Sequence, residues 1–221
     1  MNQLLSQFFS IDIEPDDDIE PDHNAPQDAA APAGIPAGEL TTPERMWELI
    51  AAQPPKMVHR EDHRVSGVMT AKAYSAFPAG VVFAASVFDT LLPHDLSLVR
   101  VYPGGGHGFR FRLPGSALSG AERLPQDENA RAARLIEHLS GLCEHHVSPV
   151  FQTMREASGA DLRSMWSLLS TNIKTIYLRM RMPPYQQQLG LSEDKLQQLA
   201  DDEARIFSHG PNSPFPARAR N

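Results

Sequence analysis

The stretch that decides the fold reads VSGVMTAKAYSAFPAGVVFAASVFDTLL over residues 65–92, and it is small or apolar almost throughout. A helix exposed to water carries a polar stripe, and this run leaves too few polar positions for one, so it is typical of helices buried on most sides. We expect a pair of buried helices here that forms the floor of the core. Pro78 and Gly80 are the residues where the pair should break.

After this stretch the period of the apolar residues changes from helical to alternating. Residues 96–102 (LSLVRVY) and 109–113 (FRFRL) flank the glycine-rich sequence PGGGHG, which predicts a β-hairpin near 96–113. The alternation places apolar side chains on one face and basic side chains on the other: Phe109, Phe111 and Leu113 against Arg110 and Arg112. Because the glycines join two strands instead of opening a helix, a phosphate-binding loop is not indicated.

Helical periodicity covers most of the remaining chain. We expect helices at 43–52, from about 126 to 157 with a kink or junction at Pro149, from a cap at Asp161 to Pro183, and from Ser192 to about Phe207. The expected fold class is therefore α+β. It is a mainly helical single domain over residues 41–208, with the hairpin packed on the helices as a small antiparallel sheet.

The two ends of the chain lack this periodicity. Residues 1–40 hold nine acidic residues and no lysine or arginine, and residues 14–38 are rich in Asp, Pro and Ala with little to bury. We therefore expect residues 1–40 to be a disordered acidic segment and residues 209–221 to be a flexible tail. The short apolar run within residues 4–13 either packs back on the domain or frays, and fraying is the interpretation we favour.

Composition argues against several classes of function. Residues 41–221 hold 18 acidic and 20 basic residues, so the domain is nearly neutral. A nucleic-acid-binding surface is therefore not expected. No run approaches the roughly 18 apolar residues of a membrane span, and the amino terminus lacks the basic start of a secretory signal. We expect a cytoplasmic protein without an integral membrane segment.

Metal chemistry has weak support in the sequence. The single cysteine, Cys143, rules out a disulfide or a cysteine-ligated cluster built by one chain, and a small buried residue is its ordinary role. His138, His145 and His146 lie on one expected helix without the spacing of four residues that metal ligands favour there. We expect no metal site. We also expect no catalytic residue, since no nucleophile, base and orienting acid share a familiar spacing.

Two groups of residues are candidates for ligand contact. Arg100, Arg110 and Arg112 on the polar face of the hairpin suit carboxylate or hydroxamate oxygens, which a guanidinium group binds bidentately. The alternative for these arginines is a solvated hairpin face. Trp166 and Asn172 share the most aromatic helix, which either packs in the core or forms a wall facing a ligand.

Two blocks of the sequence resemble a known protein family. The first is RVSGVMTAKAY (64–74), followed by an apolar helix, LSL (96–98) and the hairpin end FRL (111–113). The second is LIEHL (135–139) through Pro149 and Val150, then GADLRSMWS (159–167) and Asn172. Together they resemble the FhuF-like ferric siderophore reductases, whose domain is also similar to the carboxy-terminal part of the siderophore synthetases that work without nonribosomal assembly. The resemblance covers residues 45–207.

The resemblance implies cytoplasmic handling of ferric siderophores, in which one-electron reduction of the bound Fe(III) releases the iron. It also implies a ligand pocket between the 65–92 helices, the hairpin and the helix of Trp166, lined by Ser66, Lys72, Arg112, Trp166 and Asn172. Members of the family take the electron from a [2Fe–2S] cluster held by four cysteines, which follow a segment resembling residues 206–218. This sequence carries no cysteine there, so we expect no cofactor bound by this chain. The expected partners are a ferric siderophore and an electron-donor or siderophore-pathway protein.

Two further interpretations stay open at this point. A protein with the pocket but without cluster ligands could be a non-catalytic module for siderophore binding or siderophore biosynthesis. A helical adaptor for protein interactions, unrelated to iron, would account for the apolar start of the chain and the acidic segment that follows it.

Overall fold

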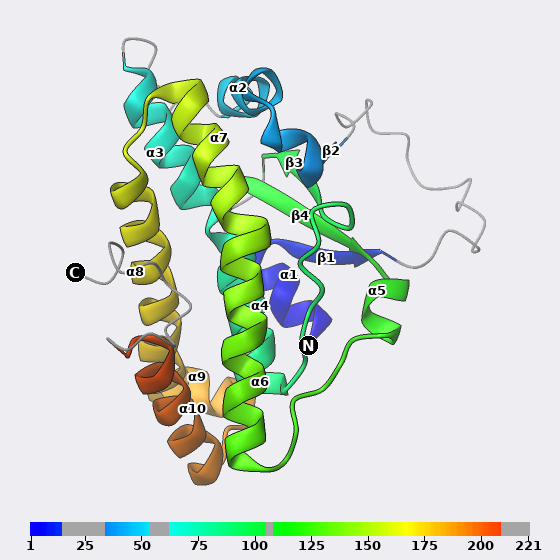
Figure 1. Ribbon diagram of the computed structural model, residues 1–221. Coiled ribbons are helices and arrows are strands. Elements are labelled where there is room, and N and C mark those ends of the chain that lie inside the picture. Colours follow the sequence, from blue (N-terminus) through cyan, green and yellow to red (C-terminus); the bar gives the residue numbers. More distant parts are fainter. Residues whose placement is uncertain (15–33, 54–61, 105–107, 209–221) are drawn as a thin grey trace.

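The computed structural model has a body of long helices with a small sheet against one side (Figure 1). It describes residues 1–14, 34–53, 62–104 and 108–208. The mainly helical α+β class expected from the sequence is confirmed. The expected flexible tail, residues 209–221, lies outside the described residues.

Two helices from the opening stretch form the centre of the core. α3 (His63–Tyr74) and α4 (Ala76–Phe88) follow each other directly, and eleven of the 13 residues of α4 are buried. By length and composition, His63–Phe88 could cross a membrane, but 83% of its apolar window is buried inside the protein, as in a core helix. The expected pair of buried helices is confirmed.

The break between these helices lies a few residues earlier than expected. α3 ends at Tyr74, Ser75 separates the two helices, and Pro78 lies inside the first turn of α4. The N–H groups of a first turn have no acceptor within the helix, so a proline there removes no hydrogen bond. Gly80 allows a close approach instead, because a Cβ on it would lie 2.4 Å from Cδ1 of Ile11.

A four-stranded mixed sheet packs on these helices, in the order β1-β4-β3-β2. Its strands are β1 (Ile11–Glu14), β2 (Ile35–Pro36), β3 (Arg100–Pro103) and β4 (Phe109–Pro114). β3 and β4 form the expected antiparallel hairpin. β1 runs parallel to β4 at one edge and β2 runs antiparallel to β3 at the other, so the sheet is larger than the expected hairpin.

The amino terminus is ordered, so the expected disorder over residues 1–40 is wrong for residues 1–14 and 34–40. α1 (Asn2–Phe9) packs on α4 and leads into β1, and the 3₁₀ helix η1 (Ala37–Thr41) follows β2. The rest of the expected disordered segment, residues 15–33, lies outside the described residues.

Burial explains why the start of the chain does not fray. Leu5, Phe9 and Ile11 are buried, and the ring centroid of Phe9 lies 5.1 Å from that of Phe83 on α4. Removing three such side chains from water offsets the conformational entropy lost when a short segment becomes ordered. The apolar run therefore packs back on the domain, which is the alternative to the fraying that we favoured from the sequence.

The remaining helices surround this core (Figure 1): α2 (Pro43–Ala51), α5 (Ser116–Ser119), α6 (Glu128–Gly141), α7 (Ser148–Ser158), α8 (Leu162–Met180), α9 (Pro183–Leu189) and α10 (Glu193–Ile206). The expected caps are confirmed: Asp161 accepts from the N–H of Ser164, and Ser192 accepts from the N–H of Lys195. Pro183 follows the end of α8, as expected, and also begins α9, since a first helical turn suits proline.

α6 and α7 form one long rod, joined by the π-helical segment η2 (Leu142–Val147) (Figure 1). Pro149 is the second residue of α7, two positions after this segment ends, where the sequence predicted a kink or a junction. Proline has no N–H to donate to the preceding turn, and a wider turn accommodates its ring.

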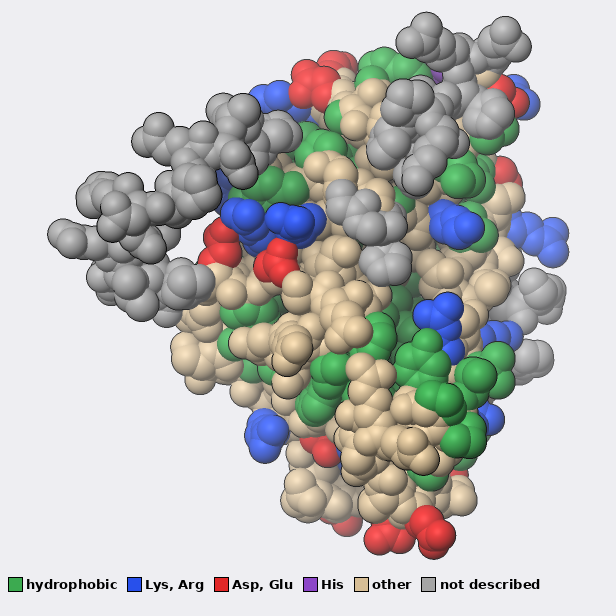
Figure 2. Space-filling model, turned by 180° about the vertical axis from the view of Figure 1, so that it is seen from behind, with side chains coloured by type: hydrophobic (Ala, Val, Ile, Leu, Met, Phe, Trp, Pro, Cys, Tyr) green, Lys and Arg blue, Asp and Glu red, His purple; other side chains and the backbone are tan. Residues whose placement is uncertain are grey.

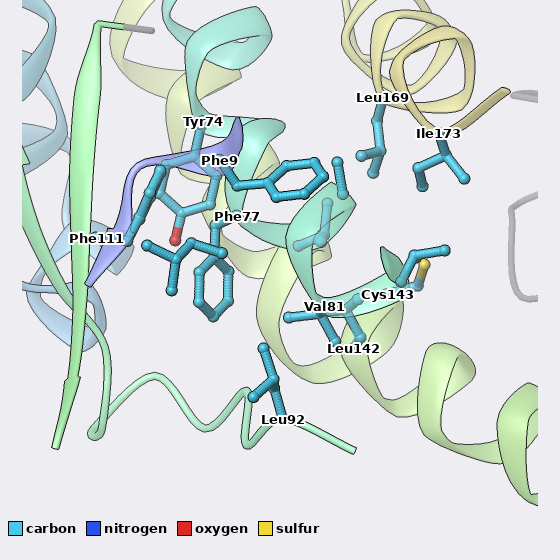
Figure 3. Packing of buried hydrophobic residues seen from close by; sticks show 14 of the residues in the cluster. Phe9, Tyr74, Phe77, Val81, Leu92, Phe111, Leu142, Cys143, Leu169 and Ile173 are labelled. Carbon is cyan, nitrogen blue, oxygen red and sulfur yellow. The ribbon is translucent and has the colours of Figure 1, made fainter. Parts of the chain in front are cut away.

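The core lies between α3, α4, α8 and the inner face of the sheet (Figure 3). The ring centroids of Tyr74 and Phe77 lie 5.5 and 5.3 Å from that of Phe111 on β4. Cys143 on η2 is buried in another part of the same hydrophobic cluster, and its burial raises the pKa of the thiol to about 12. The helices therefore cover the inner face of the sheet, and the polar side chains of its strands lie on the outer face.

Candidate functional site

The outer face of the sheet carries a row of arginines. On β4, Phe111 is fully buried while Arg110 is exposed and Arg112 is half-buried, because successive side chains of a strand point to opposite faces. The register places Arg100 opposite Arg112, and Tyr102 opposite Arg110. We call the side chains of Arg100, Tyr102, Arg110 and Arg112 the arginine face.

β1 brings two carboxylates to the arginine face. Asp12 lies beside Arg112 in the parallel register, and its Oδ2 is 3.4 Å from Nε of Arg110. Oε1 of Glu14 lies 2.6 Å from Nη1 of Arg112. The hydroxyl of Ser6 donates to Oδ1 of Asp12 over 2.6 Å and orients that carboxylate. Seen from behind, basic and acidic side chains lie against each other on the surface (Figure 2).

The ring of Tyr102 lies against the guanidinium group of Arg112. The central carbon of this group lies 4.4 Å from the ring centroid of Tyr102, and Nη1 lies 3.5 Å from the hydroxyl oxygen. Because a stacked guanidinium is already oriented, it loses less freedom when it binds a planar anion. Arg100 is held by donating from Nη1 to the carbonyl oxygen of Gly34 at 3.3 Å. The arginine face is therefore suited to carboxylate or hydroxamate oxygens.

The structure does not bring the five predicted ligand residues together. Ser66 on α3 and Trp166 on α8 are buried within the helical body, and Trp166 packs edge-on against Phe151 with 5.4 Å between the ring centroids. β4 turns Phe111 toward α3 and Arg112 away from it. The sheet therefore separates Arg112 from Ser66 and Trp166.

The other two predicted residues lie on helix surfaces. Lys72 is exposed on α3, and Asn172 is half-buried on α8. A hollow of about 900 Å³ opens between α6 and α10, and a smaller one lies beside α9 and α10. None of the five predicted residues lines either hollow. Of the five, Arg112 is the one that belongs to the arginine face.

A second group of charges lies at the contact of α6 and α10, where Arg131 and Asp202 are buried and Asp89 and Lys195 are partly buried. Arg131 of α6 donates to both carboxylate oxygens of Asp202, at 2.6 and 3.0 Å, and to Oδ1 of Asp89 at 3.0 and 3.1 Å. Lys195 donates to Oδ2 of Asp89 at 2.9 Å. Burial by itself would lower the pKa of Arg131, but the hydrogen bonds and charges of the two carboxylates outweigh burial and raise it. We call these four residues the buried charge cluster.

Three histidines meet beside η2. Nε2 of His146 lies 2.8 Å from the hydroxyl oxygen of Tyr74, and its Nδ1 lies 2.7 Å from the carbonyl oxygen of His94. The ring centroids of His94 and His138 are 4.8 Å apart. Burial lowers the pKa of His138 and of His146 to about 4, so both are neutral at pH 7. Within the described ranges, no three His, Cys, Asp or Glu side chains are grouped so as to hold a metal ion.

Sequence reasoning missed Asp12 and Glu14 as partners of the arginine face. The order Ile11-Asp12-Ile13-Glu14 alternates between apolar and acidic residues, which is the pattern of a half-buried strand. The composition around it obscured this pattern, because nine acidic residues in the first 40 favour disorder. Four residues are also too few to predict the strand that they pair with.

Comparison with known proteins assigns no family to this chain. No protein-family model matches the sequence, and no curated protein matches it. The chemistry of the arginine face therefore follows from its own geometry.

Proposed function

We propose that this protein binds ferric siderophores and that the arginine face contacts the anionic oxygens of the ligand. The observation that carries the proposal is the ion pair between Arg112 and Glu14, in which a guanidinium oriented by Tyr102 binds a carboxylate. Hydroxamate and carboxylate siderophores present planar oxygen groups of the same kind, and guanidinium forks match them bidentately. The resemblance to the FhuF-like reductases supports ferric iron as the metal of the ligand.

A [2Fe–2S] cluster of the kind that the resemblance implies does not fit this chain. Such a cluster takes four protein ligands, which are usually cysteine thiolates. The sequence holds one cysteine, and Cys143 is buried in η2 with the pKa of its thiol raised to about 12. We therefore propose a cytoplasmic binding module. Reduction of its bound iron takes one electron per Fe(III) from a separate electron-donor protein or flavin reductase.

The adaptor interpretation rested on the apolar start of the chain and on the acidic segment after it, and the first of these no longer supports it. The apolar start of the chain is not free to bind a partner, because Leu5 and Phe9 are buried and α1 packs on α4. Ile11 is also buried, within β1. These side chains belong to the core, which leaves ligand binding as the function that the geometry supports best.

Titration with a ferric hydroxamate and a ferric citrate-type siderophore tests the proposal. Trp47 and Trp166 provide the fluorescence signal, and equilibrium dialysis of the coloured complexes provides a second measurement. We expect binding in the micromolar range and a loss of about tenfold in affinity for Arg112→Gln, since hydrogen bonds to charged groups are removed.

The matched control for this titration is Arg205→Gln. Arg205 forms an exposed ion pair of 2.8 Å with Glu128, on helices away from the sheet, so this change should leave affinity unchanged. If neither class of ferric siderophore binds, or if both variants lose affinity equally, the proposal is wrong.

Iron reduction is measured separately from binding. The protein with its bound ferric siderophore is incubated anaerobically with reduced flavin and a chelator that becomes coloured with Fe(II). If the protein presents its ligand to a donor, Fe(II) forms faster with the protein than without it. An unchanged rate restricts the function to binding.

A further inference from the structure

The carboxylates of β1 occupy the positions that an anionic ligand of the arginine face would take. Oε1 of Glu14 lies 2.6 Å from Nη1 of Arg112, and Oδ2 of Asp12 lies 3.4 Å from Nε of Arg110. Both carboxylates are on one strand, two residues apart, so they face the same side of the sheet as the arginines. The chain thus presents a pair of anions to its own pair of guanidinium groups.

The backbone of β1 is held in place independently of these ion pairs. Ile11 is fully buried and lies so close to Gly80 that a Cβ there would come within 2.4 Å of it. The N–H of Phe111 donates to the carbonyl oxygen of Ser10 at 2.8 Å, next to the parallel pairing of β1 with β4. Exchange at the arginine face therefore requires movement of acidic side chains and leaves the strand in the sheet.

Both acidic side chains are partly exposed, and Asp12 must also give up its hydrogen bond from the hydroxyl of Ser6 when it moves. The side chain of Glu14 is 43% exposed, and that of Asp12 is 31% exposed. Ion pairs at such exposure contribute little, since water solvates both partners when they separate. An incoming anion can therefore replace the carboxylates without unfolding any element.

We propose that Asp12 and Glu14 are internal ligands of the arginine face, which an external anion must displace. This inference rests on the proposed function in one respect, the assignment of the arginine face as the ligand site. It adds a rule for specificity: a ligand needs two or more anionic groups to replace both carboxylates. A ligand with one anionic group replaces one of them and meets repulsion from the other.

Citrate and acetate, without iron, are the probes that test this rule. Calorimetric titrations at low ionic strength use the full chain, Glu14→Gln, and the double variant Asp12→Asn/Glu14→Gln. Both changes keep side-chain size and remove charge. We expect citrate to bind about threefold more tightly to the single variant and about tenfold more tightly to the double variant, since one or two weak internal pairs are lost. Acetate should gain less than about threefold.

Glu128→Gln is the matched control, because Glu128 also pairs with an arginine, Arg205, but on α6 and α10. This variant should bind citrate as the unmodified protein does. Circular dichroism and the urea midpoint establish that each variant is folded. The inference is overturned if citrate affinity is unchanged or lower in both acidic-residue variants, if acetate gains as much as citrate, or if citrate binds to none of the proteins.

The same measurements distinguish this inference from the proposed function. If citrate affinity rises from the unmodified protein to the single and then the double variant, and ferric siderophores do not bind, Asp12 and Glu14 are internal ligands but the siderophore function is wrong. If ferric siderophores bind through Arg112, but removal of the Asp12 and Glu14 charges changes neither the affinity for citrate nor that for siderophores, the inference is wrong and the proposed function is supported.

Discussion

Two arginine–carboxylate pairs in this protein have the same nitrogen–oxygen distance but differ in burial. Nη1 of Arg112 lies 2.6 Å from Glu14 on the sheet, and Nη1 of Arg131 lies 2.6 Å from Asp202 beneath α10. The side chains of the first pair are 33% and 43% exposed, and those of the second are 7% and 1% exposed. Water competes with the first pair and is excluded from the second. The first pair can therefore exchange its partner, whereas the second holds helices together.

The buried charge cluster joins elements that are distant in the sequence. Asp89 ends α4 with a left-handed backbone (φ 52°), which turns its side chain toward α6 and α10 and their basic groups. Burial lowers the pKa of Lys195, against the opposing effect of Asp89. Arg131 and Asp202, whose side chains are 7% and 1% exposed, depend on each other most, because a buried charge without a partner is costly.

The largest expected effect is the loss of the Asp202 charge. Asp202→Asn keeps the size of the side chain but leaves Arg131 with less compensation, so the free energy of unfolding should fall by about 3–5 kcal/mol. Urea unfolding followed by circular dichroism measures the change. The matched substitution on the sheet, Glu14→Gln, should cost less than about 1 kcal/mol. Equal losses from the two substitutions would contradict the comparison.

Low pH extends the comparison to two buried groups that are neutral at pH 7, the imidazoles of His138 and His146. The pKa of His146 and of His138 is lowered to about 4 by burial, below the value of about 6.5 for an unfolded histidine. Between these values the unfolded chain binds more protons, so stability that is present above pH 6.5 is lost as the pH falls through 4. We expect a loss of up to about 3 kcal/mol for each histidine, measured by urea unfolding across this range.

Substitution of neighbouring histidines identifies the source of this acid sensitivity. His146→Gln removes one buried imidazole and should flatten the dependence of stability on pH. His145 is exposed in the same π-helical segment, so His145→Gln should leave the dependence as it is. The explanation fails if the two variants show the same pH profile.

The smallest expected effect on stability is that of Arg112→Gln. This change breaks a partly exposed ion pair and the contact with the Tyr102 ring, and the free energy of unfolding should change by less than about 1 kcal/mol. Affinity for the ferric siderophore should nevertheless fall about tenfold, because the same guanidinium binds the ligand. Unfolding and binding measured on the same preparation show whether folding and function separate at the sheet. A large loss of stability would place Arg112 with the buried charge cluster.

Local patterns were enough for the elements that one segment specifies. The alternation of 109–113 predicted β4 and the direction of its arginines, and the caps at Asp161 and Ser192 predicted the starts of α8 and α10. Each of these patterns depends on residues a few positions apart. The break in the helix pair was misplaced at Pro78 because proline is tolerated in a first helical turn.

Patterns failed where a partner comes from a distant segment. The acidic composition of residues 1–40 predicted disorder, although four of these residues form a parallel strand along β4. Placing Arg112 in one pocket with Ser66 and Trp166 failed for a related reason. A residue pattern shows that a side chain is on one face of a strand, but not which helices cover that face.

By itself, the sequence determined the helical α+β class, the buried helix pair and the separation of apolar from basic side chains on the hairpin. These follow from periodicity and burial along single segments. Only the tertiary structure decided the partner of each arginine: Glu14 for Arg112 at the partly exposed surface of the sheet, and Asp202 for Arg131 in the interior. Strand register and helix packing bring together residues far apart in the chain, and burial then determines whether a charge can change its partner.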